Sequence, residues 1–281
     1  MKIKLSCLLI LLMFSPFVRA QHHNTEYDSI YSVHLKELRQ IKISIPKKYN
    51  SKEKFDVLYV LDGEWATSLS ETVYEFLEYA EFIPTNMIIV SIPNYYKDGI
   101  NMRRRDFIPS RTKTQPSLIG AKNFLSFLKE ELIPSIDKKY PTKTENNILY
   151  GSSLGGLFTV YAYLEEPSLF KSYISIEPVL RSNENYISKI ASERFEKNRD
   201  SKNTLWISSR DGKAFDDMGI AKFESILTLK APKNLYWKIE TYPNETHFSV
   251  IWKGIYDGLK FTYRKSKSNK KIINRADVID K

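Results

Sequence analysis

The sequence predicts an α/β fold: a mostly parallel central sheet with helices on both faces, entered through an antiparallel N-terminal hairpin. Short apolar segments of strand type alternate with longer segments whose apolar residues recur at helical spacing. This alternation is typical of parallel βαβ units. The chain shows no internal repeat, and the 261 residues that follow residue 20 suit one domain with a sizeable core.

The expected strands and helices follow one another along the chain. Strands are predicted at residues 38–46, 55–61, 87–92, 146–150, 173–177, 203–208 and 235–242. Helices are predicted at residues 68–81, 117–138, 154–166, 187–197, 216–229 and 247–262. The buried face of the second helix is marked by Leu118, Leu125, Leu128, Leu132 and Ile136. Residues 95–115 are polar and basic, which predicts an insertion that forms a pocket.

The N-terminus predicts export. Lys2 and Lys4 precede an apolar segment that ends in Val18-Arg19-Ala20, which is the pattern of a secretory signal peptide, residues 1–20. The segment is short for a membrane span, and Cys7, the sole cysteine, lies inside it. We therefore expect a cysteine-free mature protein in the periplasm or outside a bacterium, without stable membrane insertion.

Positive charge is concentrated at the C-terminus. The formal net charge is +10, and residues 264–281 hold seven basic and two acidic residues. The body at residues 21–263 is then close to neutral, and residues 264–281 are expected to be a solvated, flexible tail. No nucleic-acid partner is expected.

A Gly-x-Ser-x-Gly pattern centred on Ser153 lies between a predicted strand and a predicted helix. This context predicts a nucleophile elbow, a sharp turn that exposes the serine hydroxyl. Gly151 and Gly155 leave room for close backbone approach, and the amide of Leu154 would point at a developing oxyanion. Without this context the pattern indicates only a turn, so the prediction depends on the flanking strand and helix.

A serine nucleophile requires a base, and His247 is left after the other histidines are excluded. His22 and His23 lie at the N-terminus, and His34 precedes the first predicted strand. His247 follows the nucleophile, in a turn-rich loop after the last predicted strand. This is the chain order Ser…acid…His of α/β-hydrolases.

The acid that would orient this histidine has several candidate positions. Asp211 is the first choice, because it comes just past a predicted strand where this fold usually keeps its acid. Asp217 lies further along and could equally cap the next helix. Glu177 offers a second route, because it ends the preceding predicted strand, where some lipase-like enzymes keep their acid.

Further segments form a recognisable set with these residues. They are Leu58-Tyr59-Val60-Leu61-Asp62-Gly63, Ile89-Val90-Ser91-Ile92-Pro93-Asn94, Arg105-Asp106-Phe107-Ile108-Pro109 and Glu131-Leu132-Ile133-Pro134-Ser135-Ile136-Asp137. With the elbow and the histidine loop, they resemble the esterase family that includes enterochelin (siderophore) esterases, esterase D and the antigen 85 mycolyltransferases. The resemblance runs from about residue 30 to about residue 263.

The resemblance implies an α/β-hydrolase fold and serine-dependent ester cleavage, with no cofactor and no metal. It also implies that the amide of Glu64, the residue after Asp-Gly, is the second oxyanion donor beside Leu154. Relatives often have Ser-Pro-Ser where this chain has Glu177-Pro178-Val179, so Glu177 is also a candidate for contact with substrate. Some siderophore esterases of this type work with serine and histidine alone, so a catalytic dyad without an acid is the alternative to a triad.

The run Arg103-Arg104-Arg105 lies between two of these motifs, in the loop expected to border the pocket. Arg104 and Arg105 are candidates for binding an anionic or catecholate substrate. The alternative is an ordinary solvated loop.

Together these residues favour a secreted serine hydrolase that cleaves carboxylic esters through an acyl-enzyme. An acyltransferase that uses the same acyl-enzyme and a catalytically silent binding protein are the alternatives. The expected partner is a small-molecule or glycan ester. An iron-siderophore lactone, an acetylated or feruloylated polysaccharide and a lipid-like ester all stay open.

Overall fold

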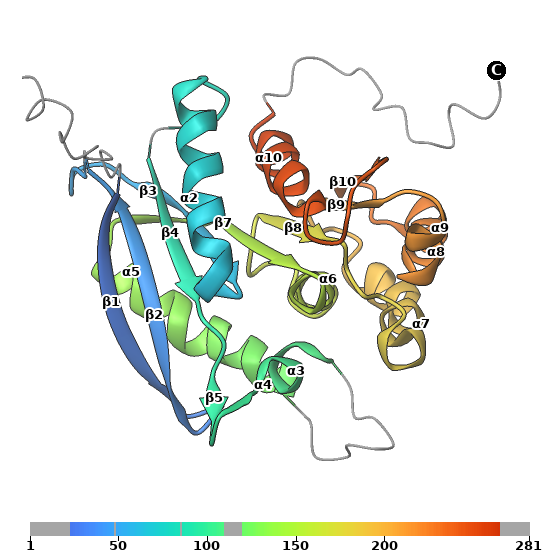
Figure 1. Ribbon diagram of the computed structural model, residues 1–281, viewed down its shortest axis with the longest axis horizontal. Coiled ribbons are helices and arrows are strands. Elements are labelled where there is room, and N and C mark those ends of the chain that lie inside the picture. The colour runs from blue at the N-terminus through green and yellow to red at the C-terminus, as the bar shows by residue number, and fades with distance from the viewer. Residues whose placement is uncertain (1–22, 48, 85, 110–119, 265–281) are drawn as a thin grey trace, which may run out of the picture.

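The computed structural model describes residues 23–47, 49–84, 86–109 and 120–264. Its centre is an eight-stranded sheet in the order β1-β2-β4-β3-β7-β8-β9-β10 (Figure 1). The strands are β1 (His23–Ser32), β2 (Glu37–Pro46), β3 (Phe55–Leu61), β4 (Met87–Ile92), β7 (Thr142–Ser152), β8 (Ser172–Ile176), β9 (Thr204–Arg210) and β10 (Tyr236–Tyr242). The β1–β2 and β2–β4 pairs are antiparallel and the others are parallel. The predicted fold class is therefore confirmed.

Strand β1 is absent from the predicted strands, although it pairs with β2 over its whole length. Between its two buried end residues, His23 and Ser32, every side chain is exposed or half-buried. An edge strand with this exposure needs no alternation of apolar and polar residues. The hydropathy pattern on which the other strands were predicted is therefore missing here.

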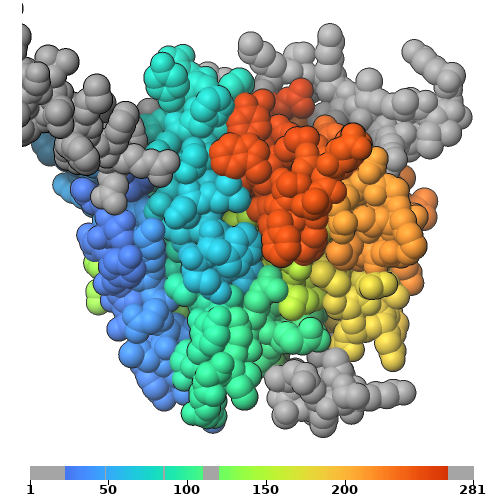
Figure 2. Space-filling model, in the orientation of Figure 1, coloured from blue at the N-terminus to red at the C-terminus, as the bar shows by residue number. Residues whose placement is uncertain are grey.

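Helices cover both faces of the sheet. Helices α2 (Gly63–Tyr79) and α10 (Val250–Thr262) lie side by side on one face (Figures 1 and 2). The opposite face is covered by α4 (Gly120–Ser126), η2 (Phe127–Leu132), α5 (Ile133–Lys139), α6 (Leu154–Glu165), α7 (Ser182–Lys197) and α9 (Ile220–Lys230). Smaller elements are β5 (Tyr96–Lys97), β6 (Ile100–Asn101), α3 (Arg103–Phe107) and α8 (Lys213–Asp217). None of the helices in the described ranges is long and apolar enough to cross a membrane.

Backbone geometry explains where the helices differ from the prediction. The helix predicted at 117–138 is a continuous helical stretch from Gly120, but its middle, η2, has π-helical hydrogen bonding. The helix predicted at 216–229 is interrupted by Gly219, whose φ is 78°, so that α8 and α9 are separate. In α7, residues 183–185 have left-handed backbone angles, and regular helix begins close to the predicted start at residue 187. The predicted signal peptide and most of the predicted tail lie outside the described residues.

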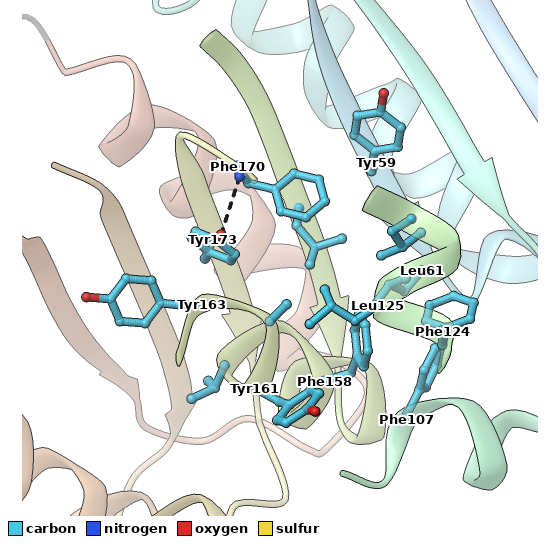
Figure 3. Close-up of a cluster of buried hydrophobic side chains, with 14 of the residues drawn as sticks. Tyr59, Leu61, Phe107, Phe124, Leu125, Phe158, Tyr161, Tyr163, Phe170 and Tyr173 are labelled. Carbon is cyan, nitrogen blue, oxygen red and sulfur yellow. Dashed lines mark hydrogen bonds between the residues drawn. The ribbon is translucent and has the colours of Figure 1, made fainter. Parts of the chain in front are cut away.

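An aromatic cluster attaches the polar insertion to the helix of the elbow (Figure 3). Phe107 of α3 lies with its ring centroid 5.5 Å from that of Phe124 and 5.7 Å from that of Phe158 of α6. The ring centroids of Phe124 and Phe158 are 5.1 Å apart, in an edge-to-face arrangement. All three rings are buried, so this packing fixes the segment that contains Arg103–Phe107 next to the start of α6.

A buried ion-pair network attaches the same segment to β2. Arg39 contacts Asp106 at 2.7 Å and Glu37 at 3.0 Å, and these three side chains are at most 5% exposed. Arg105 reaches Glu37 at 2.5 Å and Asp106 at 2.8 Å. Two arginines and two carboxylates therefore balance one another in the interior, where an unpaired charge would be costly.

We expect Arg39→Met to lower the free energy of unfolding by about 3 kcal/mol, because it leaves buried carboxylates short of a partner. Lys129→Met is the matched control. Lys129 forms an ion pair with Glu166, and the two side chains are 45% and 34% exposed, respectively. Exposed pairs of this kind contribute about 1 kcal/mol or less to stability. Urea unfolding of both variants measures the difference. Equal effects would contradict a supporting role for the network.

Candidate active site

Ser153 occupies a sharp turn between β7 and α6, the strand–turn–helix layout that its motif predicts. Its backbone angles, φ 56° and ψ −116°, are unusual for a residue with a side chain and signal local strain of the kind found at functional sites. Its amide donates to the carbonyl of Ile176 at 2.9 Å. A Cβ at Gly151 would lie 2.4 Å from the Gly155 carbonyl oxygen, so only glycine allows α6 to approach the end of β7 this closely.

His247 lies in the loop between β10 and α10. Its Nδ1 is 3.9 Å from Oε1 of Glu177, and its side chain is 31% exposed. Two reciprocal hydrogen bonds fix the loop around it: Thr246 donates its amide to Ser249 Oγ at 2.8 Å, and Ser249 donates its amide to Thr246 Oγ1 at 3.1 Å. Helix α10 packs across β8 and β9 and thereby brings the loop back over the end of β8.

Glu177 follows β8 directly and is fully buried, with a φ of 47°. It accepts hydrogen bonds from the Arg210 amide at 2.9 Å and from Arg210 Nε at 2.8 Å. Burial alone would raise the pKa of this carboxyl, but the facing His247 and the bonds from Arg210 outweigh burial and lower it. Glu177 is therefore ionised at neutral pH and presents a negative charge to the imidazole.

The structure gives the other carboxylate candidates different surroundings. Asp211 is exposed, and no ion pair within the described ranges joins it to His247. Asp217 pairs with Lys213 at 2.5 Å. The sheet order explains the difference, because β8 is the immediate neighbour of β7, whereas the end of β9 lies one strand further from Ser153. The geometry thus favours Glu177, the second choice from sequence, over Asp211.

Two helix N-termini meet beside Ser153. Helix α6 begins at Leu154 and α2 begins at Gly63, and their preceding strands, β7 and β3, are parallel neighbours. Leu154 and Glu64 lie in the first turns of these helices, where amides have no acceptor within the helix. The aligned peptide dipoles make both ends favourable for negative charge. The side chain of Glu64 is turned aside, since it accepts hydrogen bonds from the Asn94 amide and side chain.

The three consecutive arginines have three different surroundings. Arg105 is held in the ion-pair network with Glu37 and Asp106, so its guanidinium is already engaged. Arg104 is exposed and has no ion pair among the described residues. Arg103, which the sequence singles out only as part of this run, forms a double hydrogen bond with Asp62 and donates to the Ser152 carbonyl. Three identical neighbours in a sequence do not show which of them forms ion pairs within the fold.

No group of three or more His, Cys, Asp or Glu side chains in the described ranges is arranged to hold a metal ion. Ser153 and His247 are residue types that serve as nucleophile and base in covalent catalysis.

The fold and the elbow define a protein of α/β-hydrolase architecture. Residues 32–251 match the family described as "Putative esterase", and the chain belongs to this family. Among curated proteins it is similar to "Ferri-bacillibactin esterase BesA" of Bacillus subtilis (strain 168), with 33% identity over 97 residues, 31% of this chain and 34% of that protein. It is also similar to "Apo-salmochelin esterase" of Escherichia coli O6:H1, with 24% identity over 147 residues, 49% of this chain and 45% of that protein. The matched segments thus span a third to a half of these relatives.

Solved structures match over a larger part of the chain. An "IroE-like serine hydrolase" from Shewanella oneidensis has a TM-score of 0.74 and 29% identity, covering 85% of this chain and 80% of that one. The "BES protein" from Bacillus cereus has a TM-score of 0.73 and 25% identity, and the match covers 85% of this chain and 96% of that one. The predicted family resemblance is confirmed.

Proposed function

We propose that the protein is a serine esterase that cleaves carboxylic esters through an acyl-enzyme. The observation that carries the proposal is the strained turn at Ser153, which lies at the same sheet edge as two helix N-termini and the His247–Glu177 pair. The family membership and the esterase relatives support it. A nucleophile, a base and donors for negative charge are the parts that acyl transfer requires.

In the proposed reaction, Ser153 Oγ attacks the acyl carbon while His247 takes the hydroxyl proton. The carbonyl oxygen becomes an oxyanion, which the amides of Leu154 and Glu64 stabilise. The carbon–oxygen ester bond then breaks, and the leaving alcohol receives the proton from His247. Water repeats the sequence: His247 takes its proton, the oxygen attacks the acyl carbon, and Ser153 leaves with the proton restored.

Glu177 is the acid of this proposal. When His247 carries a proton, its imidazolium faces the ionised Glu177 carboxylate, 3.9 Å away between Nδ1 and Oε1. At an effective dielectric constant of 20, opposite charges about 4 Å apart attract by about 4 kcal/mol. Arg210 offsets part of this attraction, since it pairs with the same carboxylate.

We expect Glu177→Gln to lower kcat by about 10- to 100-fold, because the substitution removes the charge that stabilises the imidazolium. Asp211→Asn is the matched control, and its kcat should stay within about twofold of the unsubstituted protein, since an exposed carboxylate without an ion pair to the histidine contributes little. Steady-state kinetics on a p-nitrophenyl ester compare the two variants. The reverse ranking would return the acid to the end of β9, and small losses in both would indicate a Ser–His dyad.

The substrate class that we propose is an iron-siderophore ester. The names of the relatives, "Ferri-bacillibactin esterase" and "Apo-salmochelin esterase", support this class. The predicted signal peptide supports a location in the periplasm or outside the cell.

Purified residues 21–281 should be tested on a catecholate siderophore lactone, a feruloylated polysaccharide and a p-nitrophenyl ester. We expect the highest kcat/KM on the siderophore lactone. Release of the free acid in water without an added alcohol distinguishes an esterase from an acyltransferase. Absence of turnover on all three substrates, with a folded protein, would favour the silent binding protein.

A further inference from the structure

We propose that Arg103 is a positioning residue that joins the two loops of the oxyanion site and neutralises a buried carboxylate between them. The inference rests on the proposed esterase function. It concerns a residue whose side-chain hydrogen bonds in the described part of the chain go to Asp62 and the backbone of Ser152.

The first observation is the set of contacts made by one guanidinium group. Arg103 Nε lies 2.5 Å from Asp62 Oδ1, and Nη2 lies 2.8 Å from Asp62 Oδ2. The same Nη2 donates to the carbonyl oxygen of Ser152 at 3.1 Å. Asp62 precedes the first turn of α2, and Ser152 precedes the nucleophile. Arg103 therefore connects the loop that presents the Glu64 amide to the turn that presents Ser153 and Leu154.

The second observation is the position of Asp62. Its side chain is fully buried and its φ is 56°, so the residue forms a tight left-handed turn directly before α2. A Cβ at Gly155 would lie 3.1 Å from Asp62 Oδ2. The carboxylate therefore lies against the first turn of α6, beside the amides expected to hold the oxyanion.

A carboxylate at this place opposes catalysis unless its charge is balanced. Negative charge develops on the substrate oxygen only in the transition state, and a nearby anion would repel it through a medium of low dielectric constant. Arg103 supplies the compensating charge in a rigid bidentate geometry that a lysine cannot reproduce. Asn94 completes the arrangement, because its side-chain nitrogen donates to Asp62 at 2.9 Å and to Glu64 at 2.5 Å.

The position of Arg103 is itself fixed. Its guanidinium carbon lies 5.6 Å from the centroid of the buried Phe107 ring, which belongs to the aromatic cluster with Phe158 of α6. Arg103 is 23% exposed, so water screens its ion pair only in part. The arrangement links the polar insertion to the oxyanion loops through one side chain.

The test compares Arg103→Met, Arg103→Lys and the double variant Asp62→Asn/Arg103→Met. We expect Arg103→Met to lower kcat by about 100-fold with KM changed less than about threefold, because the lost interaction acts on the transition state. Arg103→Lys should recover part of this loss, since it keeps the charge and loses the bidentate fork. The double variant should exceed Arg103→Met in kcat, since the uncompensated carboxylate is gone. Arg199→Met, which removes an arginine that is 73% exposed, is the control and should leave kcat unchanged.

A second readout is the rate of covalent labelling by a fluorophosphonate, which should fall in parallel with kcat. If circular dichroism shows that Arg103→Met does not fold, Arg103→Lys and the double variant decide. A lower kcat in Arg103→Lys than in the unsubstituted protein, and a higher kcat in the double variant than in Arg103→Lys, support the inference. Unchanged kcat in a folded Arg103 variant, with Ser153→Ala inactive, would overturn the inference and leave the proposed function intact. Retained activity in Ser153→Ala would instead overturn the proposed function.

Discussion

Ser153→Ala is expected to abolish ester hydrolysis, with a loss in kcat on the order of 10⁵-fold, because no other group at the elbow can form the acyl-enzyme. The strained turn is compatible with alanine as much as with serine, so the fold should survive. Hydrolysis of p-nitrophenyl acetate or butyrate measures the loss, and circular dichroism measures the fold.

Ser152→Ala is the matched control for this prediction. Ser152 is the adjacent residue, but its side chain is 2% exposed, so its hydroxyl cannot reach a substrate. The substitution keeps the carbonyl group that accepts from Arg103, and most of the activity should remain. Loss of activity in Ser152→Ala together with activity in Ser153→Ala would place the nucleophile one residue earlier.

His247→Gln is expected to cost about as much as Ser153→Ala, because a nucleophile and its base act as one unit. The activity of the unsubstituted protein should also depend on pH. Only a neutral imidazole accepts the serine proton, so kcat/KM measured between about pH 5 and 8 should be lower on the acidic side.

His34→Gln is the control for the base. His34 pairs with Glu130 at 2.8 Å on the partly exposed surface of η2, so its loss should leave both kcat and the pH profile unchanged. A flat profile over this pH range, or a fully active His247→Gln variant, would count against His247 as the base.

Much of the fold could be predicted because apolar strands and amphipathic helices have characteristic hydropathy periods. Residues 55–61 and 87–92 are buried throughout and match their strands, β3 and β4, closely. The edge strand β1 has no such period, since it is solvated. The interruption of a helix at Gly219 depends on a left-handed backbone angle, which periodicity does not report.

The turn at Ser153 could be predicted from sequence, because the strand, the turn and the helix that form it are encoded in consecutive residues. The ranking of Glu177 and Asp211 depends instead on the order of strands in the sheet and on the return of the His247 loop across them. The roles of Arg103 and Arg105 depend on ion pairs to residues 41 and 68 positions away in the chain. A single sequence does not display such distant pairs.

Covalent labelling with a fluorophosphonate probe, followed by peptide mapping by mass spectrometry, tests the central claim most directly. The account predicts one adduct per chain, on Ser153, with labelling absent in Ser153→Ala and strongly slowed in His247→Gln. The reaction requires an activated serine and an oxyanion site but no knowledge of the natural ester. A folded protein that is not labelled, or an adduct on another residue, would contradict the account.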